Sequence, residues 1–105
     1  MGRFNGLNPD LAVYAERLYL WAEANGLRPR ITSVLRTRQQ QTILYERYLR
    51  GQSRFPAAPP GRSLHEQGLA FDMVTSDQGR SAGGVWNAAG GRWSPNDWVH
   101  YEYRG

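Results

Sequence analysis

The amino-acid sequence predicts a single α+β domain in which helices pack on a small antiparallel sheet. Helical patterns dominate the first half of the chain and strand patterns the second half, without the regular strand–helix alternation that a parallel sheet requires. The chain has only 105 residues, which is enough for one modest hydrophobic core and too few for two. We therefore expect residues 1–105 to form one domain.

The first elements expected are a helix and a strand. Asn8 followed by Pro9 is typical of a helix start, and apolar side chains then recur at helical spacing as far as Gly26. Residues 30–36, RITSVLR, are rich in β-branched side chains and alternate with a period of two. They predict a strand that ends at Arg36.

A second helix and a long loop follow. Thr37 and Gln40 have the spacing of a capping box, which predicts that a helix begins there. Gly51 is typical of the end of such a helix. Residues 51–61 contain three prolines and two glycines, which excludes regular structure. Loops of this length often line a functional site.

The second half of the chain predicts two strands. Residues 69–74, LAFDMV, alternate so that Asp72 faces away from its apolar neighbours, and an aspartate in such a strand requires an explanation. Residues 75–91 are rich in glycine, serine and alanine, with at most one helical turn at residues 85–89. Residues 98–103, WVHYEY, predict a last strand that places His100 and Glu102 on one face.

The composition excludes several kinds of chemistry. The chain has no cysteine, so it has neither disulfides nor thiolate metal sites. All 13 basic residues are arginine, which excludes Schiff-base and P-loop lysine mechanisms. A net charge of +4 suits an anionic partner, such as nucleic acid, a membrane surface or the polymer of a bacterial cell wall. The sequence contains no run of 18 apolar residues and no export signal at its start, so we expect no membrane insertion.

The two histidines of the chain each have carboxylates nearby in the sequence. His65 precedes Asp72 by seven residues, and His100 lies three residues after Asp97 and two before Glu102. Two imidazoles and one carboxylate with an open fourth position are the ligand set of a catalytic zinc site. The residues alone leave open the alternative of ordinary packed or surface histidines.

A longer pattern surrounds these residues. Five positions match S-x-H-x-x-G-x-A-x-D, and two later positions match D/E-x-x-H; they are Ser63, His65, Gly68, Ala70, Asp72, Asp97 and His100. Together they resemble the zinc peptidoglycan peptidases that comprise VanY-type D-Ala-D-Ala carboxypeptidases and the L-alanyl-D-glutamate endopeptidases of phage endolysins. The resemblance implies a Hedgehog/DD-peptidase-like fold.

The resemblance also implies roles for individual residues. It assigns His65, Asp72 and His100 as ligands of Zn²⁺ and Asp97 as the general acid and base. Zinc held in this way lowers the pKa of a water and polarises the scissile carbonyl. An aspartate at position 97, rather than a glutamate, is more similar to the endolysin branch.

A third block, SVLRTRQQQ, resembles the family's substrate-binding segment. Ser33, Arg36 and Gln41 match this segment, and the resemblance implies that Arg36 binds a substrate carboxylate and that Gln41 contacts the substrate. Ser63, from the histidine motif, is also expected to contact the substrate. A planar guanidinium can hold a carboxylate through two parallel hydrogen bonds.

The resemblance therefore implies zinc-dependent hydrolysis of peptide bonds in the peptidoglycan stem peptide. We expect a monomeric phage endolysin or tail-associated wall hydrolase, made in the host cytoplasm and acting on the cell wall. L-Ala-D-Glu endopeptidase activity is favoured over D-Ala-D-Ala carboxypeptidase activity. The alternative is a catalytically silent wall-binding or virion structural domain with the same fold. Nucleic-acid binding is disfavoured because the arginines are dispersed along the chain.

Overall fold

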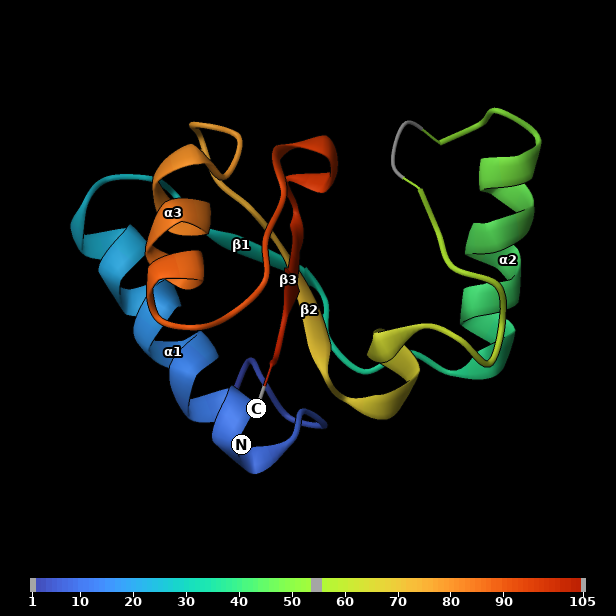
Figure 1. Cartoon of the computed structure of the whole chain (residues 1–105), viewed down its shortest axis with the longest axis horizontal. Coiled ribbons are helices and arrows are strands. Elements are labelled where there is room, and N and C mark those ends of the chain that lie inside the picture. The colour runs from blue at the N-terminus through green and yellow to red at the C-terminus, as the bar shows by residue number, and fades with distance from the viewer. Residues whose placement is uncertain (1, 54–55, 105) are drawn as a thin grey trace.

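The computed structural model describes residues 2–53 and 56–104 and confirms an α+β architecture (Figure 1). The α-helices are α1 (Pro9–Ala24), α2 (Arg38–Leu49) and α3 (Arg80–Ala88), and two short 3-10 helices are η1 (Leu64–Gln67) and η2 (Pro95–Asp97). The strands β1 (Arg30–Ser33), β2 (Ala70–Val74) and β3 (His100–Glu102) form one antiparallel sheet in the order β1-β2-β3. The predicted fold class is thus confirmed.

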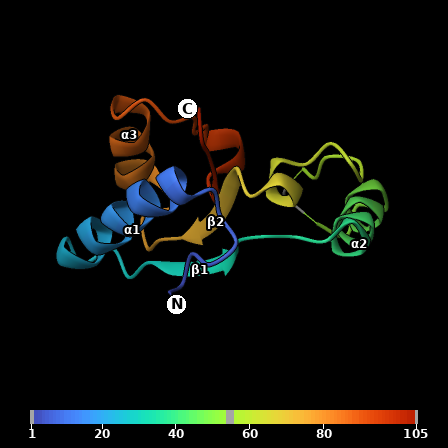
Figure 2. The same ribbon diagram turned by 90° about the horizontal axis from the view of Figure 1, so that it is seen from below.

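The core lies between one face of the sheet and the helices α1 and α3, which cover it together (Figure 2). Phe71 and Tyr101, from neighbouring strands, are fully buried there with their rings stacked 5.1 Å apart. Leu11 and Leu18 of α1 and Trp86 of α3 complete this core. Because strand side chains alternate, the residues between these core positions point to the opposite face of the sheet.

Both predicted helix starts are confirmed by their caps. The Asn8 side chain accepts hydrogen bonds from the backbone of Asp10 and Leu11 at the start of α1. Thr37 and Gln40 exchange the two hydrogen bonds of a capping box at the start of α2. These side chains satisfy backbone N–H groups that have no partner within the helix.

The predicted strand over residues 30–36 is too long, and Arg36 does not end a strand. The β1–β2 pairing shifts register between Ile31 and Ser33, and β1 stops there. The backbone N–H of Arg36 instead donates to the carbonyl of His65, at 3.1 Å. The segment after β1 is therefore tied to η1 and not to a neighbouring strand. The last strand is likewise shorter than residues 98–103.

Helix α3 is longer than the single turn expected from the sequence. Two glycines, Gly83 and Gly84, lower the helix propensity of this segment. Gly83 is nevertheless required where it is, because a Cβ atom at this position would overlap the Trp93 ring. Tertiary packing of α3 against Trp93 thus outweighs the local preference of the sequence.

Helix α2 stands apart from the other helices, beyond the second face of the sheet (Figure 1). Gln41 is its single buried residue, and Ile43, Tyr48 and Leu49 are exposed. None of the described helices is both long and apolar enough to cross a membrane.

Candidate metal centre

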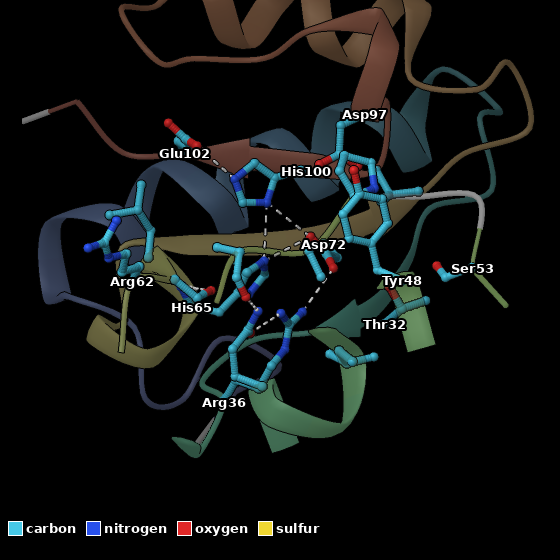
Figure 3. Close-up of a pocket in the computed structure, with 18 of the residues that line it drawn as sticks. Thr32, Arg36, Tyr48, Ser53, Arg62, His65, Asp72, Asp97, His100 and Glu102 are labelled. Atoms are coloured by element: carbon cyan, nitrogen blue, oxygen red, sulfur yellow. Dashed lines mark hydrogen bonds and ion pairs between the residues drawn. The ribbon is translucent and has the colours of Figure 1, made fainter. Parts of the chain in front are cut away.

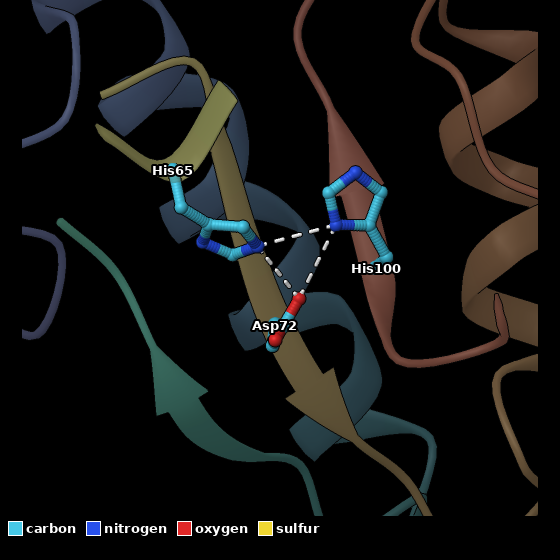
Figure 4. Close-up of side chains that lie close together, drawn as sticks. All are labelled: His65, Asp72 and His100. Atoms are coloured by element: carbon cyan, nitrogen blue, oxygen red, sulfur yellow. Dashed lines mark hydrogen bonds and ion pairs between the residues drawn. The ribbon is translucent and has the colours of Figure 1, made fainter. Parts of the chain in front are cut away.

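Three side chains on the open face of the sheet bring their donor atoms to one point (Figure 4). His65 comes from η1, Asp72 from β2 and His100 from β3, where it pairs directly with Asp72 in the strand register. Asp72 Oδ1 lies 3.0 Å from His65 Nε2 and 3.4 Å from His100 Nδ1. The two histidine nitrogens are 3.2 Å apart. The structure thus brings together the three predicted ligands.

These spacings fit a tetrahedral metal ion. Ligand atoms bound about 2.0–2.1 Å from a tetrahedral zinc lie ~3.3 Å from one another. The three donor distances of 3.0, 3.2 and 3.4 Å lie close to this value. Two imidazole nitrogens and one carboxylate oxygen are also the donors that a catalytic zinc site uses, with a fourth position left for substrate or water.

The second nitrogen of each imidazole has its own partner. His65 Nδ1 lies 3.2 Å from the carbonyl oxygen of Val34, and His100 Nε2 lies 2.9 Å from Glu102 Oε1. Both acceptors favour a proton on the ring nitrogen that they face, which leaves the other nitrogen of each ring as a lone-pair donor. The sequence analysis placed Glu102 on the same strand face as His100; in the structure it is the hydrogen-bond partner that orients the His100 ring.

Arg36 and the histidines hold the carboxylate of Asp72 from both sides. Arg36 Nη2 donates to Asp72 Oδ2 at 3.1 Å, while the histidines approach Oδ1. Burial alone would raise the pKa of Asp72, but the hydrogen bonds from His100 and His65 and their charges hold it well below its ordinary value. The surroundings of Asp72 therefore favour the anionic form that metal binding requires.

The guanidinium of Arg36 is held by three side chains of the protein. Its Nη1 donates to Gln41 Oε1 at 2.7 Å, and its Nη2 donates to Ser33 Oγ at 2.8 Å as well as to Asp72. Burial lowers the pKa of Arg36, and the charge of Asp72 counteracts this shift. Three of its five N–H groups are thus already committed.

Gln41 and Ser63, both expected to contact substrate, also make contacts inside the protein. The Gln41 amide joins Arg36 to the carbonyl of Ala58, which fixes the loop after α2. The Ser63 hydroxyl accepts from the backbone N–H of His65 at 3.2 Å and caps η1. Both residues therefore position the metal ligands and their neighbours, and both also line the cleft described next.

A cleft of about 640 Å³ lies between this face of the sheet, α2 and the loop that precedes η1 (Figure 3). The volume is in the range of small-molecule sites in proteins. Asp97, at the end of η2, lines the cleft together with the three candidate ligands and Arg36. Burial raises the pKa of Asp97 above its ordinary value, and the histidines partly counteract this rise. A carboxylate of this kind suits proton transfer.

Several residues that line the cleft were not predicted as site residues. They include Thr32, Leu44, Tyr48, Arg62 and Val99. The sequence around Tyr48 contains no motif that would indicate a place in a functional site. Arg62 directly precedes the motif that contains His65, and this adjacency is the one signal that could have indicated it.

Comparisons with known proteins identify a family and a fold for this chain. Residues 5–104 match the VanY family, described as D-alanyl-D-alanine carboxypeptidase. No curated protein sequence matches the chain. Among solved structures, a zinc-containing mutant of the vancomycin-resistance D,D-pentapeptidase VanY from a VanB-type cassette is similar with a TM-score of 0.74 and 24% identity, over 96% of this chain and 75% of that one.

Two further structures support the same fold. The LD-carboxypeptidase LdcB has a TM-score of 0.72 and 24% identity, over 96% of this chain and 67% of that one. An L,D-carboxypeptidase DacB of Streptococcus pneumoniae has a TM-score of 0.68 and 26% identity, over 96% of this chain and 68% of that one. Nearly the whole chain therefore corresponds to the shared domain of these enzymes.

Proposed function

The chain belongs to the VanY family of D-alanyl-D-alanine carboxypeptidases, and from this premise we propose that it hydrolyses peptide bonds in the stem peptide of peptidoglycan. The family consists of zinc metallopeptidases that act on peptidoglycan. The observation that carries the proposal is the meeting of His65, Asp72 and His100 at the base of a cleft that also contains Asp97. These groups supply both a metal site and a proton carrier.

In this proposal His65, Asp72 and His100 hold the zinc ion, which supplies Lewis-acid chemistry and lowers the pKa of a water toward ~7. Asp97 accepts a proton from the attacking water at its carboxylate and later delivers it to the leaving amine. Burial favours the protonated form of Asp97, which helps the second of these steps. Glu102 keeps His100 oriented through the hydrogen bond to its ring.

Arg36 contributes to substrate binding from the floor of the cleft in this proposal. Its free N–H on Nη1 can donate to a substrate oxygen. Binding of a carboxylate by both terminal nitrogens would require Nη2 to release Ser33 or Asp72. Gln41 and Ser63 each keep a hydrogen that they can donate to the substrate in the same way.

Two bonds of the stem peptide are candidates for cleavage. The family and the carboxypeptidases LdcB and DacB favour removal of a carboxy-terminal residue, with the D-Ala-D-Ala bond as the first candidate. The aspartate at position 97 favours the L-Ala-D-Glu bond, because it is more similar to the endolysin branch. A carboxypeptidase requires recognition of a free carboxylate beside the scissile bond, which an endopeptidase does not.

The place of action follows from the substrate. We propose that the protein works as a monomer on the cell wall, and that phage-type delivery belongs with the endopeptidase alternative. A silent wall-binding domain with the same fold is disfavoured by the retention of the metal ligands together with Asp97.

The experiment that tests the proposal combines metal analysis with product identification. The purified protein is incubated with a stem pentapeptide, and the products are identified by mass spectrometry. Loss of the carboxy-terminal D-alanine indicates a carboxypeptidase, and loss of the amino-terminal L-alanine indicates the endopeptidase; fragmentation of the product shows which end was shortened. The protein is expected to hold one zinc per chain, and His65→Ala is expected to lose both zinc and cleavage. Zinc binding without any cleavage would support the silent domain.

A further inference from the structure

One cation of the cleft has no partner within the described part of the chain. Arg62 lines the cleft and is exposed, and its guanidinium makes no hydrogen bond or ion pair with any described residue. The other arginine that lines the cleft is Arg36, which is half-buried and bonded to Asp72, Ser33 and Gln41. A free guanidinium beside a metal centre is suited to a carboxylate of the substrate.

The backbone that carries Arg62 is held in place on both sides. The N–H of Arg62 donates to the carbonyl of Pro59 at 3.0 Å, which closes a turn. The preceding N–H, of Gly61, donates to the Glu66 carboxylate at 2.8 Å. On the other side, Ser63 caps the helix that presents His65. Arg62 therefore has a free side chain on a fixed backbone, three residues from a metal ligand.

Arg62 also occupies one end of the cleft. Figure 3 shows Arg62 and Tyr48 on opposite sides of the group formed by His65, Asp72 and His100. A peptide that lies along the cleft with its scissile bond at the metal centre extends toward Arg62 on one side. Two of the three acidic groups that line the cleft are engaged at its centre, where Asp72 contacts both histidines and Arg36, and Glu102 contacts His100; the third, Asp97, makes no ion pair with Arg62. They leave the charge of Arg62 for the substrate.

We propose that Arg62 binds a carboxylate of the stem peptide and thereby selects which stem peptides are cleaved, an inference that rests on the peptidase function proposed above. Stem peptides carry carboxylates that bacteria also make in amidated form, and an amide lacks the charge that a guanidinium recognises. The proposal thus assigns to Arg62 the discrimination between the charged and the amidated substrate.

The test compares each carboxylate of the substrate with its amide. The zinc-loaded protein is assayed with a stem pentapeptide and with derivatives in which one carboxylate at a time is converted to a carboxamide. For one of these positions, amidation is expected to lower kcat/KM of the wild-type protein by about 5- to 50-fold, the range of a charge-assisted contact near the surface. The loss is expected mainly in KM, because the contact binds the substrate remote from the reacting atoms.

Variants at Arg62 test whether this residue causes the preference for the free carboxylate over the amide. In Arg62→Gln the ratio of kcat/KM for the free and amidated substrates is expected to fall to within about twofold of one, while Arg62→Lys retains part of it. Arg17→Gln, on the exposed side of α1, is the control for the lost charge and is expected to keep the full wild-type ratio. Zinc content and melting temperature of all variants are measured alongside.

Two results would overturn the inference while the peptidase function stands. One is an unchanged ratio in Arg62→Gln, and the other is a wild-type protein that cleaves every amidated derivative as fast as its parent. If the wild-type protein cleaves no stem peptide at all, the proposed function fails, and the selection assigned to Arg62 is withdrawn with it.

Discussion

His65 and His100 present different ring nitrogens to the same point: Nε2 of His65 and Nδ1 of His100 lie 3.2 Å apart. The difference follows from what lies behind each ring. Val34 places a carbonyl behind Nδ1 of His65, whereas Glu102 places a carboxylate behind Nε2 of His100. The partners behind the rings therefore determine which nitrogen of each ring faces the candidate metal site.

Removing the carboxylate behind His100 is expected to weaken zinc binding. Glu102→Ala leaves the His100 ring without its acceptor, and loss of such a partner costs about 10- to 100-fold in metal affinity. The affinity is measured by competition with a chromogenic chelator. Glu23→Ala, at an exposed position of α1, is the matched control. Equal affinities of Glu102→Ala and wild-type protein would show that this contact does not orient the ligand.

Asp97→Asn tests the proton carrier separately from the metal. An amide can hydrogen-bond to a water but cannot accept its proton, so turnover is expected to fall at least ~100-fold. Zinc content is expected to remain at one per chain, because Asp97 is outside the group of three candidate ligands. Asp10→Asn, in the first turn of α1, controls for the change in charge. Near wild-type turnover would move the role to Glu102 or Glu66.

Arg36→Lys keeps the positive charge of Arg36 but loses the planar guanidinium group with its several N–H donors. A lysine cannot contact Ser33, Gln41 and Asp72 together, so cleavage is expected to be impaired nearly as much as in Arg36→Ala. Both variants are expected to bind zinc more weakly, because Asp72 Oδ2 loses its partner. Normal cleavage together with unchanged zinc affinity in Arg36→Lys would reduce Arg36 to a contributor to the general positive charge.

The contacts that build the fold join residues at very different separations in the sequence. The caps at Asn8 and Thr37 involve partners within three residues, and for this reason the sequence alone predicted both helix starts. Arg36 bonds through its backbone to His65, and its side chain reaches Asp72, 36 residues away. No local pattern specifies such contacts, so the strand predicted through Arg36 was wrong.

The candidate site likewise contains some residues that the sequence predicted and others that it did not. The ligands were predicted because they belong to a motif with several fixed positions. Whether Glu102 supports His100 or merely faces solvent depends on the rotamer of His100, which the alternation of a strand does not determine. Arg62 was not predicted because its function depends on what its neighbours leave unpaired. The length of α3 was underestimated because the contact of Gly83 with Trp93 is tertiary.

Tyr101→Phe is expected to leave the stability unchanged or to increase it. The Tyr101 hydroxyl is buried and finds no hydrogen-bond partner in the described part of the chain, and burial raises the pKa of the phenol. Phenylalanine keeps the stacking on Phe71 and removes an unsatisfied group, whose burial costs about 1–3 kcal/mol. Thermal unfolding measures the change, with Tyr14→Phe on the exposed side of α1 as control. A clear loss of stability in Tyr101→Phe would reveal a partner for the hydroxyl.

The last prediction concerns the pH dependence of stability at the start of α3. Asp77 accepts hydrogen bonds from the Ser81 backbone at 2.9 Å and the Thr75 hydroxyl at 2.8 Å. Burial opposes the charge of Asp77, but the bonds from Ser81 and Thr75 outweigh it and hold the pKa of Asp77 below its ordinary value in the folded state. The charged form is therefore bound more favourably in the folded protein than in the unfolded chain.

The stabilisation by Asp77 is accordingly complete well above the pKa of an unfolded aspartate, ~3.9, and is lost as the pH falls through the lower folded pKa. At pH 7, Asp77→Asn is expected to lower the free energy of unfolding by about 1 kcal/mol, which corresponds to about 4–8 °C in Tm for a domain of this size. The difference in Tm between the two proteins is expected to shrink as the pH is lowered from about 5 toward 2, because both then carry a neutral side chain. Metal-free samples exclude a contribution from zinc release. A difference that is constant over this range would mean that the charge of Asp77 adds nothing to the hydrogen bonds, and a difference that grows toward low pH would contradict the direction of the shift.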